Sequence, residues 1–181
     1  LAELNVKMPI DEYTHTWGAY SGLHKLSITL IPAHNRRNHN YGMLSSLSLG
    51  HMPDLTELSL YNECPDMDWD NYGYTPTIDE LPNLNKLLIS GAQELTSLDL
   101  WEMLCAPESL THLTVRECQR LYTVRGHDLT SLTHLKLSGC ASLTLLDLSE
   151  CASLSHLEVT DCQALESIEG LDELLAQGTL R

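Results

Sequence analysis

Phenylalanine is absent from the 181 residues, and lysine and arginine together number only 10 against 25 aspartates and glutamates. Without phenylalanine, leucine must supply most of the core. The net charge of −15 repels phosphate backbones and anionic membrane surfaces, so we expect no nucleic acid partner and no binding to an anionic membrane. Such an acidic surface is typical of a soluble protein and would suit a basic partner.

Several motifs are also missing. No apolar run approaches the ~20 residues of a membrane-spanning helix, so we expect no membrane insertion in this segment. The six cysteines form no CxxC pair, which argues against a zinc ribbon. No GxSxG, HExxH, GxGxxG or phosphate-loop motif occurs, so we predict no enzymatic activity, no cofactor and no metal. Leu1 already lies inside a repeat phrase, and we expect any export signal to lie outside this sequence.

One short phrase, Leu-x-x-Leu-x-Leu or a close variant, recurs along the chain, and in the last part it recurs with a strict period of eleven. Its first, fourth and sixth positions are apolar, whereas the third and fifth are mostly polar. This alternation is typical of a short strand with one buried face. The phrases begin at Leu1, Leu23, Leu44, Leu55, Leu84, Leu95, Leu110, Leu121, Leu132, Leu143, Leu154 and Leu165.

Two phrases are needed to build one coil of a solenoid. A single phrase with its turn can cross the coil only once, whereas two phrases can run across, turn, run back and turn again. We therefore predict about seven coils, mainly β, with parallel strands on two faces that enclose the leucines. One sheet is expected to hold the phrases from Leu1, Leu23, Leu44, Leu84, Leu110, Leu132 and Leu154, and the other those from Leu55, Leu95, Leu121, Leu143 and Leu165.

Helix should be scarce apart from a short C-terminal cap over residues 170–177. There the stretch LDELLAQG places Leu171, Leu174 and Leu175 at helical spacing, and Gly178 can end the helix. The alternative fold is an α/β horseshoe, with strands on one side and helix or irregular chain on the other. The second half-phrases favour the two-sheet arrangement, because LTLLDLSEC is as strand-like as LTHLKLSGC.

The stretch LTHLKLSGCASLTLLDLSECASLSHLEVTDC resembles the leucine-rich repeat proteins, and in particular the nested 11+11 bacterial subclass that includes internalin J. In that subclass both halves of each repeat read LxxLxL. The resemblance covers nearly the whole chain and implies a single leucine-rich repeat domain over residues 1–181. It also implies a bacterial protein, secreted or at the cell surface, that binds other proteins or mediates adhesion.

Four cysteines follow the strands at matching places in the repeat. Cys118, Cys140 and Cys162 stand at the ninth position of every second phrase, and Cys151 is their counterpart on the other side. We expect a buried structural ladder in which the small thiol points inward at a turn and caps free backbone groups. Disulfides between neighbouring coils are the rival interpretation. They suit in-register parallel neighbours badly, because the side chains point the same way.

Three histidines, His112, His134 and His156, also recur in every second phrase, each at the third position. The solenoid should stack them in an exposed column. We interpret this column as a polar surface ladder; a metal site and a pH sensor are the alternatives. A straight column offers a tetrahedral ion two ligands readily and a third poorly. Protonation would place like charges side by side and should lower the pKa of the imidazoles.

The repeat is interrupted twice. An insertion of about 61–83 is acidic and aromatic, and a shorter one, WEMLCAPES, begins at Trp101. Long loops in compact folds are often functional, and exposed aromatic side chains are frequent binding anchors. We therefore predict a partner-binding patch in which both insertions leave the same edge of the rod, although these rings could instead pack the loop onto the rod. Its residues are Tyr61, Trp69, Tyr72, Tyr74 and Trp101.

These observations predict a non-enzymatic protein-interaction module that is monomeric and extracellular or at the cell surface, and whose partner is another protein. One alternative is the recognition domain of a larger effector or enzyme whose catalytic part lies outside this chain. Another is a carbohydrate- or calcium-dependent adhesin. The segment DMDWDN resembles the start of a calcium loop, but Asn71 and Thr77 stand where an EF-hand needs glycine and glutamate.

Overall fold

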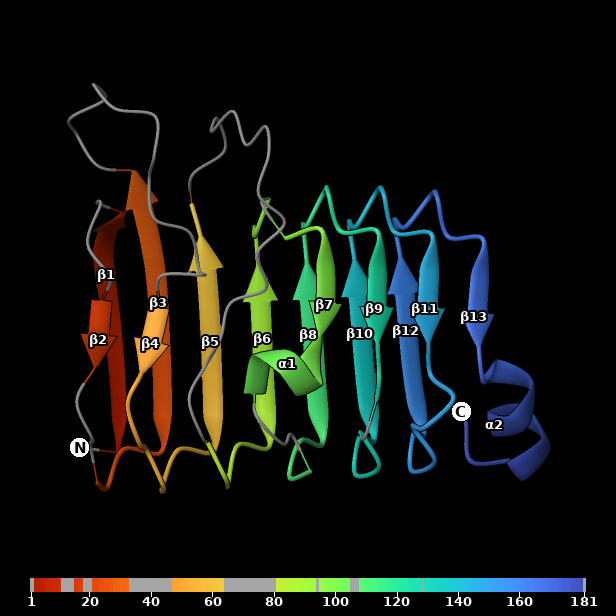
Figure 1. Cartoon of the computed structure of the whole chain (residues 1–181), viewed down its shortest axis with the longest axis horizontal. Helices are drawn as coiled ribbons and strands as arrows, with labels where there is room; N and C mark the ends of the chain where they lie inside the picture. The colour runs from red at the N-terminus through yellow and green to blue at the C-terminus, as the bar shows by residue number, and fades with distance from the viewer. Residues whose placement is uncertain are drawn as a thin grey trace.

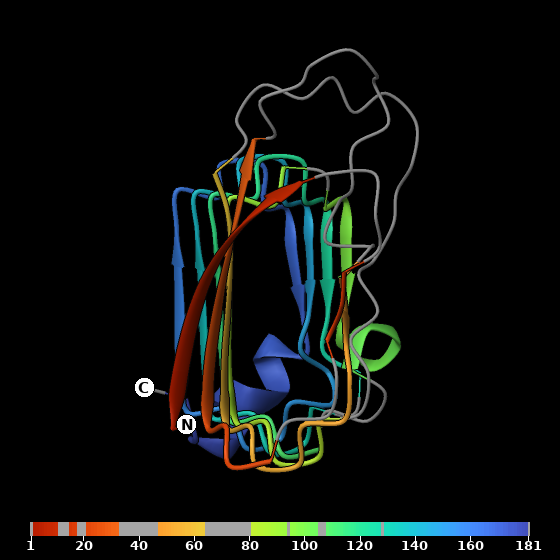
Figure 2. The ribbon, with the colours of Figure 1, turned by 90° about the vertical axis from the view of Figure 1, so that its left-hand side faces the viewer.

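The chain folds as a β-solenoid of parallel strands that ends in a short helix, in a computed structural model (Figure 1). The structure describes residues 2–10, 15–17, 21–32, 47–63, 81–93, 95–104, 108–127 and 129–180. Figure 2 looks along the rod and shows two layers of strands facing each other. The predicted mainly β solenoid with parallel strands on two faces is therefore confirmed.

Seven strands form the larger sheet, in the order β1-β3-β5-β6-β8-β10-β12, and every described pair is parallel. Their bounds are β1 Glu3–Ile10, β3 Lys25–Pro32, β5 Glu57–Asn62, β6 Lys86–Ser90, β8 His112–Arg116, β10 His134–Ser138 and β12 His156–Thr160.

The opposite face is made of two separate ladders in the described residues. Four strands pair in the order β13-β11-β9-β7, and two more pair as β2-β4. Their bounds are β2 His15–Trp17, β4 Leu47–Leu49, β7 Ser97–Asp99, β9 Thr123–Arg125, β11 Leu145–Asp147 and β13 Ser167–Glu169. Strands on both faces are thus continuous from β6 to the C-terminal end.

The structure corrects the assignment of two phrases. The Leu44 phrase supplies β4 on the second face, and the Leu55 phrase supplies β5 in the seven-stranded sheet, the reverse of the expectation. The spacing from Leu23 to Leu44 predicts one full coil, but β4 of the Leu44 phrase pairs with β2, and β3 pairs with β5 of the Leu55 phrase. The next strand of this sheet after β5 is β6, in the phrase from Leu84.

Leucines fill the space between the sheets. In the coil that starts at Leu132, the first, fourth and sixth residues of both phrases are buried: Leu132, Leu135, Leu137, Leu143, Leu146 and Leu148. Each such burial contributes about 1.5–3 kcal/mol, but only while the adjacent coils cover the side chain. Stability in such an array is therefore shared between neighbouring coils.

The same turn follows most phrases. The ninth residue points inward, and its carbonyl accepts a hydrogen bond from the leucine that opens the next phrase, as from Leu121 N to Cys118 O at 3.2 Å and from Leu143 N to Cys140 O at 3.1 Å. Glutamine side chains tie successive turns together. Gln93 Nε2 donates to Glu117 O at 2.6 Å, and Gln119 Nε2 donates to Gly139 O at 2.9 Å.

Two helices interrupt the strands. Helix α2, Leu171–Gln177, begins after Gly170 and ends at Gly178, whose N–H donates to Leu175 O. It lies across the C-terminal end of the rod (Figures 1 and 2) and buries Leu174, so the expected short C-terminal helix is confirmed. Helix α1, Leu100–Leu104, follows β7 and is not expected from the sequence.

Glycine occupies two of the turns where the chain leaves the seven-stranded sheet. Gly91 and Gly139 both hold the eighth position of their phrases with φ of 71° and 66°. A Cβ on Gly91 would lie 2.4 Å from the backbone oxygen of Asn62, whereas the atoms nearest to one on Gly139 would be 3.6 Å away. Glu117 and Asp161 occupy the same position with positive φ, so the turn itself imposes this conformation.

We predict that Gly139→Ala lowers the free energy of unfolding by about 1–2 kcal/mol, the strain of a left-handed residue that has a Cβ. Gly91→Ala should cost more, about 2–4 kcal/mol, because the backbone must also move away from the added methyl group. Urea denaturation of the two variants measures this difference. Equal losses would show that the contact with Asn62 has no energetic effect.

Candidate functional site

The outward side of the seven-stranded sheet carries three columns of side chains, one for each outward position along the strands. The first column runs through Glu3, Lys25, Glu57, Lys86, His112, His134 and His156. The second runs through Asn5, Ser27, Ser59, Leu88, Thr114, Lys136 and Glu158, and the third through Lys7, Thr29, Tyr61, Ser90, Arg116, Ser138 and Thr160. We call this surface the lysine–histidine face.

Positive charge is concentrated on this face. All four lysines of the chain and Arg116 stand in its columns, against the three acidic residues Glu3, Glu57 and Glu158. Among the described residues only two other arginines, Arg120 and Arg125, lie elsewhere. The chain as a whole has a net charge of −15, so its charge is segregated and this face differs in sign from the rest of the surface.

On the outward side of the four-stranded ladder, negative charges outnumber positive charges. One of its outward columns reads Asp99, Arg125, Asp147 and Glu169. Burial raises the pKa of Asp147, but hydrogen bonds from the hydroxyl and backbone N–H of Ser149 outweigh it, and the net pKa lies below its usual value. With three carboxylates against one guanidinium, this column is acidic.

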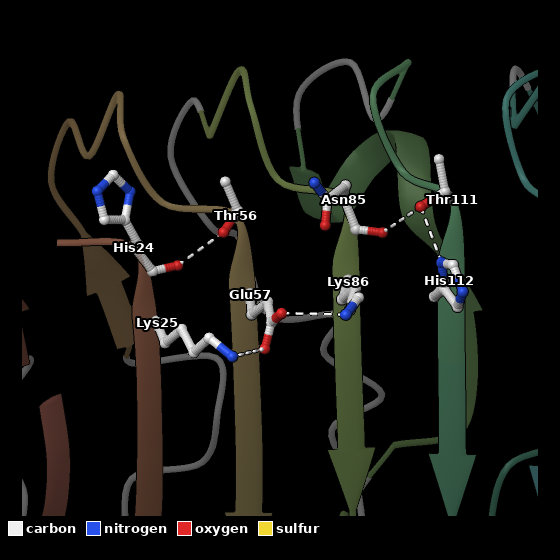
Figure 3. Close-up of polar contacts among 8 residues, drawn as sticks. All are labelled: His24, Lys25, Thr56, Glu57, Asn85, Lys86, Thr111 and His112. Atoms are coloured by element: carbon white, nitrogen blue, oxygen red, sulfur yellow. Dashed lines mark hydrogen bonds and ion pairs between the residues drawn. The ribbon is translucent and has the colours of Figure 1, made fainter. Parts of the chain in front are cut away.

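In the first half of the lysine–histidine face, opposite charges alternate from coil to coil (Figure 3). Lys25 Nζ and Lys86 Nζ each lie 3.0 Å from a different carboxylate oxygen of Glu57. Hydrogen bonds from Lys25 and then from Lys86 hold the pKa of Glu57 below its usual value, and the bond to Glu57 raises the pKa of Lys25. Exposed ion pairs add little to stability, so this alternation affects the distribution of charge on the face more than the stability of the fold.

The column continues as three stacked imidazoles. The rings of His112 and His134 have centroids 4.3 Å apart, and those of His134 and His156 are 4.2 Å apart, with 6° between the planes in each case. His112 and His134 are half-buried, and His156 is exposed. The sequence predicts this column, and the parallel register of β8, β10 and β12 produces it.

Hydroxyl groups determine which ring nitrogen carries the proton. Each ring's Nδ1 lies 2.9 Å from the hydroxyl of the preceding residue, and that hydroxyl donates to a carbonyl of the previous coil at 3.0–3.1 Å. A hydroxyl has a single proton, so here its oxygen can only accept from the ring. Each Nδ1 is therefore the donor, and each neutral Nε2 carries a lone pair. The hydroxyls belong to Thr111, Thr133 and Ser155.

This geometry does not suit a shared metal ion. Lone pairs lie in the ring planes, so three nearly parallel rings direct them along parallel lines rather than to one point. In the described parts of the chain, no group of three or more histidine, cysteine, aspartate or glutamate side chains is arranged to hold a metal ion. No described helix is long and apolar enough to cross a membrane.

The four described cysteines are free thiols. Cys118, Cys140 and Cys151 are buried, and Cys162 is partly exposed in the last coil. On the first side each Sγ donates to the carbonyl two residues earlier, as from Cys118 to Arg116 O at 3.3 Å, and Cys151 Sγ donates to Gly126 O at 3.7 Å. A Cβ on Gly126 would lie 2.6 Å from that sulfur, so this glycine makes room for Cys151.

Thiol acidity differs along the column. Hydrogen bonding with the Cys118 thiol, which can turn its proton toward a thiolate, lowers the pKa of Cys140 to about 7 against the effect of burial. Burial raises the pKa of Cys162, and it raises that of Cys151 to about 12, with the charges of Asp147 and Glu150 adding to the effect.

Of the predicted binding residues, Tyr61 lies at the outward surface of β5 with 36% of its area exposed. Trp101 lies in α1, which follows β7 of the other sheet, so its interruption leaves from the opposite layer. The expectation that both interruptions leave one edge of the rod is therefore wrong. It follows from assigning the Leu55 phrase to the wrong sheet. Trp69, Tyr72 and Tyr74, the DMDWDN segment, Cys64 and Cys105 lie outside the described residues.

Sequence reasoning missed the lysine–histidine face as a unit. The third position of the phrases reads Glu, Lys, Glu, Lys, His, His, His along this sheet, and this signal appears only when the Leu55 phrase is placed in the correct sheet. Comparisons with protein-family models, curated proteins and solved structures gave no match to this chain. The binding role of Tyr61 and the other aromatic residues stays a prediction.

Among the four described cysteines, we predict that alkylation of the native protein modifies Cys162 first and Cys140 much more slowly. The thiolate is the reactive form, so pKa alone would favour Cys140, but burial prevents the reagent from reaching it. Peptide mapping after short exposure to iodoacetamide, with urea-unfolded protein as the control, measures both rates. Faster modification of Cys140 would show that the last coils open readily.

We also predict that stability falls as the pH drops from 7.5 to 5.5. Burial, followed by the charges of His134 and Lys86, lowers the pKa of His112 below its ordinary 6.5. In this range the unfolded chain binds the proton more readily than the folded chain, so this contribution is complete above about pH 6.5 and is lost below it. Melting temperatures should depend less on pH in His112→Gln. His127→Gln, changed outside the column, is the control, and identical slopes for the wild type and His112→Gln would contradict the assignment.

Proposed function

We propose that this chain is a leucine-rich repeat protein of the nested 11+11 type that works as a non-enzymatic protein-interaction module. LxxLxL phrases on both faces of the solenoid support this family assignment. The resemblance to the bacterial subclass supports a secreted or surface-attached protein that takes part in adhesion or host binding.

The observation that carries the proposal is the segregation of charge. A stiff sheet of seven strands holds all four lysines on one outward surface of an otherwise acidic chain. Long solenoids commonly bind partners along such extended surfaces. The lysine–histidine face is therefore the proposed contact surface, and an acidic protein surface is the complementary partner.

Tyr61 gives this face a candidate anchor. It stands in the third column beside Thr29 and Ser90 and is one of the few exposed large apolar side chains in the described residues. Tyrosine supplies a rigid ring with little entropy to lose and a hydroxyl that can form hydrogen bonds at an interface. The remaining members of the column are small or polar, so the ring is accessible to a partner.

Removing two positive charges from the face should weaken partner binding. We predict that Lys86→Gln/Lys136→Gln reduces the affinity for a captured partner at least tenfold, or about 1.4 kcal/mol. The matched control is Arg120→Gln/Arg125→Gln, which removes the same charge outside the face and should leave binding unchanged. Quantitative affinity capture, followed by titration of the captured protein, measures both. Equal losses in the two variants would locate the interaction elsewhere.

A further inference from the structure

The three stacked histidines make a row of side chains that is uniform in chemistry and spacing, and Lys86 stands next to its first ring in the sheet. Lys86 stands beside His112 in the register, and the rings follow at steps of 4.3 and 4.2 Å. Their Nδ1 atoms are already bound to hydroxyls, so each ring has only Nε2 available for an external ligand. At neutral pH this is a row of lone pairs.

Protonation converts the row into three parallel donors. Each imidazolium gains an Nε2–H while its Nδ1–H stays bound to its hydroxyl, so the change needs no movement of the rings. The fixed charges that face the column are Lys86 on β6, Lys136 on β10, Glu158 on β12 and Arg116 on β8. Glu158 is paired with Lys136, and Glu57 is shared by Lys25 and Lys86, so neither carboxylate is free to neutralise the imidazoliums.

Charging neighbouring rings is costly without a counter-ion. Two like charges about 4 Å apart repel each other, and the repulsion is stronger at the effective dielectric constant of a protein surface than in water. An anion with charges along its length would neutralise all three rings at once. Its binding would therefore be coupled to proton uptake.

We propose that the His112–His134–His156 column and Lys86 form an acid-dependent binding site for a linear polymer of directly linked phosphate groups. Rings at this spacing favour a ligand whose charged groups are adjacent along its length. Carboxylates on one side of an extended peptide lie about 6.6–6.8 Å apart, twice the rise of a strand, and do not match rings at 4.2–4.3 Å. Successive phosphates of a nucleic acid strand are separated by a sugar. The binding of such a polymer to this site does not require that the chain also binds the partner protein proposed above.

Long-range repulsion from the acidic remainder of the chain does not prevent such binding at physiological salt. Charges are screened beyond about 8 Å at 0.15 M ionic strength, and the nearest charges on the face are mostly basic. High salt should nevertheless weaken the complex, because the contacts are exposed.

Calorimetric titration of the whole chain at 0.15 M salt with inorganic polyphosphate tests the proposal, and heparin, whose sulfate groups are carried on sugar rings, is the comparison. For polyphosphate we expect affinity at least tenfold higher at pH 5.5 than at pH 7.5. At pH 6.5 the heat should differ between buffers of different ionisation enthalpy, which reports proton uptake. Equal acid-dependent binding of heparin would show that the site does not select directly linked phosphates.

The variant His112→Gln/His134→Gln/His156→Gln should lose this acid-dependent binding, and His127→Gln, outside the column, should retain it. Circular dichroism checks the fold of the triple variant. If it is unfolded, His134→Gln, which interrupts the row at its centre, should lower the affinity at pH 5.5 at least threefold. Affinity that does not change with pH, full binding by the triple variant, equal binding of poly-aspartate, or no binding of polyphosphate at pH 5.5 would overturn the proposal.

Discussion

In-register stacking of parallel strands is the constraint on which the rest of this structure depends. Each coil places its residues beside the residues with the same repeat position in the coils on either side. Leucine therefore packs against leucine, hydroxyl follows hydroxyl, and imidazole stacks on imidazole. The residue type at one repeat position therefore determines how side chains of adjacent coils interact. Contacts between apolar or neutral aromatic side chains are favourable, and contacts between like charges are unfavourable.

The two halves of the lysine–histidine face respond differently to that constraint. From Glu3 to Lys86 the column avoids like-charge contacts by alternating sign. From His112 onward the column instead consists of imidazole rings that stack face to face. Titration can therefore change the second half while the first half keeps its charge, which separates the face into a constant part and an acid-responsive part.

Much of this fold can be predicted from the sequence, because the regular two-phrase period from Leu110 onward fixes which residues become neighbours. The period places His112, His134 and His156 in one column, and it places three of the cysteines in another. Prediction fails where the period is broken. From Leu23 to Leu84 the sequence does not show which phrase belongs to which sheet. One wrong assignment, that of the Leu55 phrase, places Glu57 and Tyr61 in the wrong sheet. The sequence also cannot show which ring nitrogen of each histidine carries the proton. That assignment depends on the hydrogen bonds of the three neighbouring hydroxyl groups, which only the structure shows.

The spacing of the phrases has a consequence for how such a chain can change length. Duplicating a unit of two phrases, for example from Leu132 to Ser153, would add one coil and lengthen the leucine, cysteine and histidine columns together without disturbing either sheet. Duplicating a single phrase would instead exchange the faces of everything that follows and would divide the histidines between opposite sides of the rod. Gene duplication can therefore extend the row of imidazoles one ring at a time, and the capacity of this surface for charge could grow by whole steps.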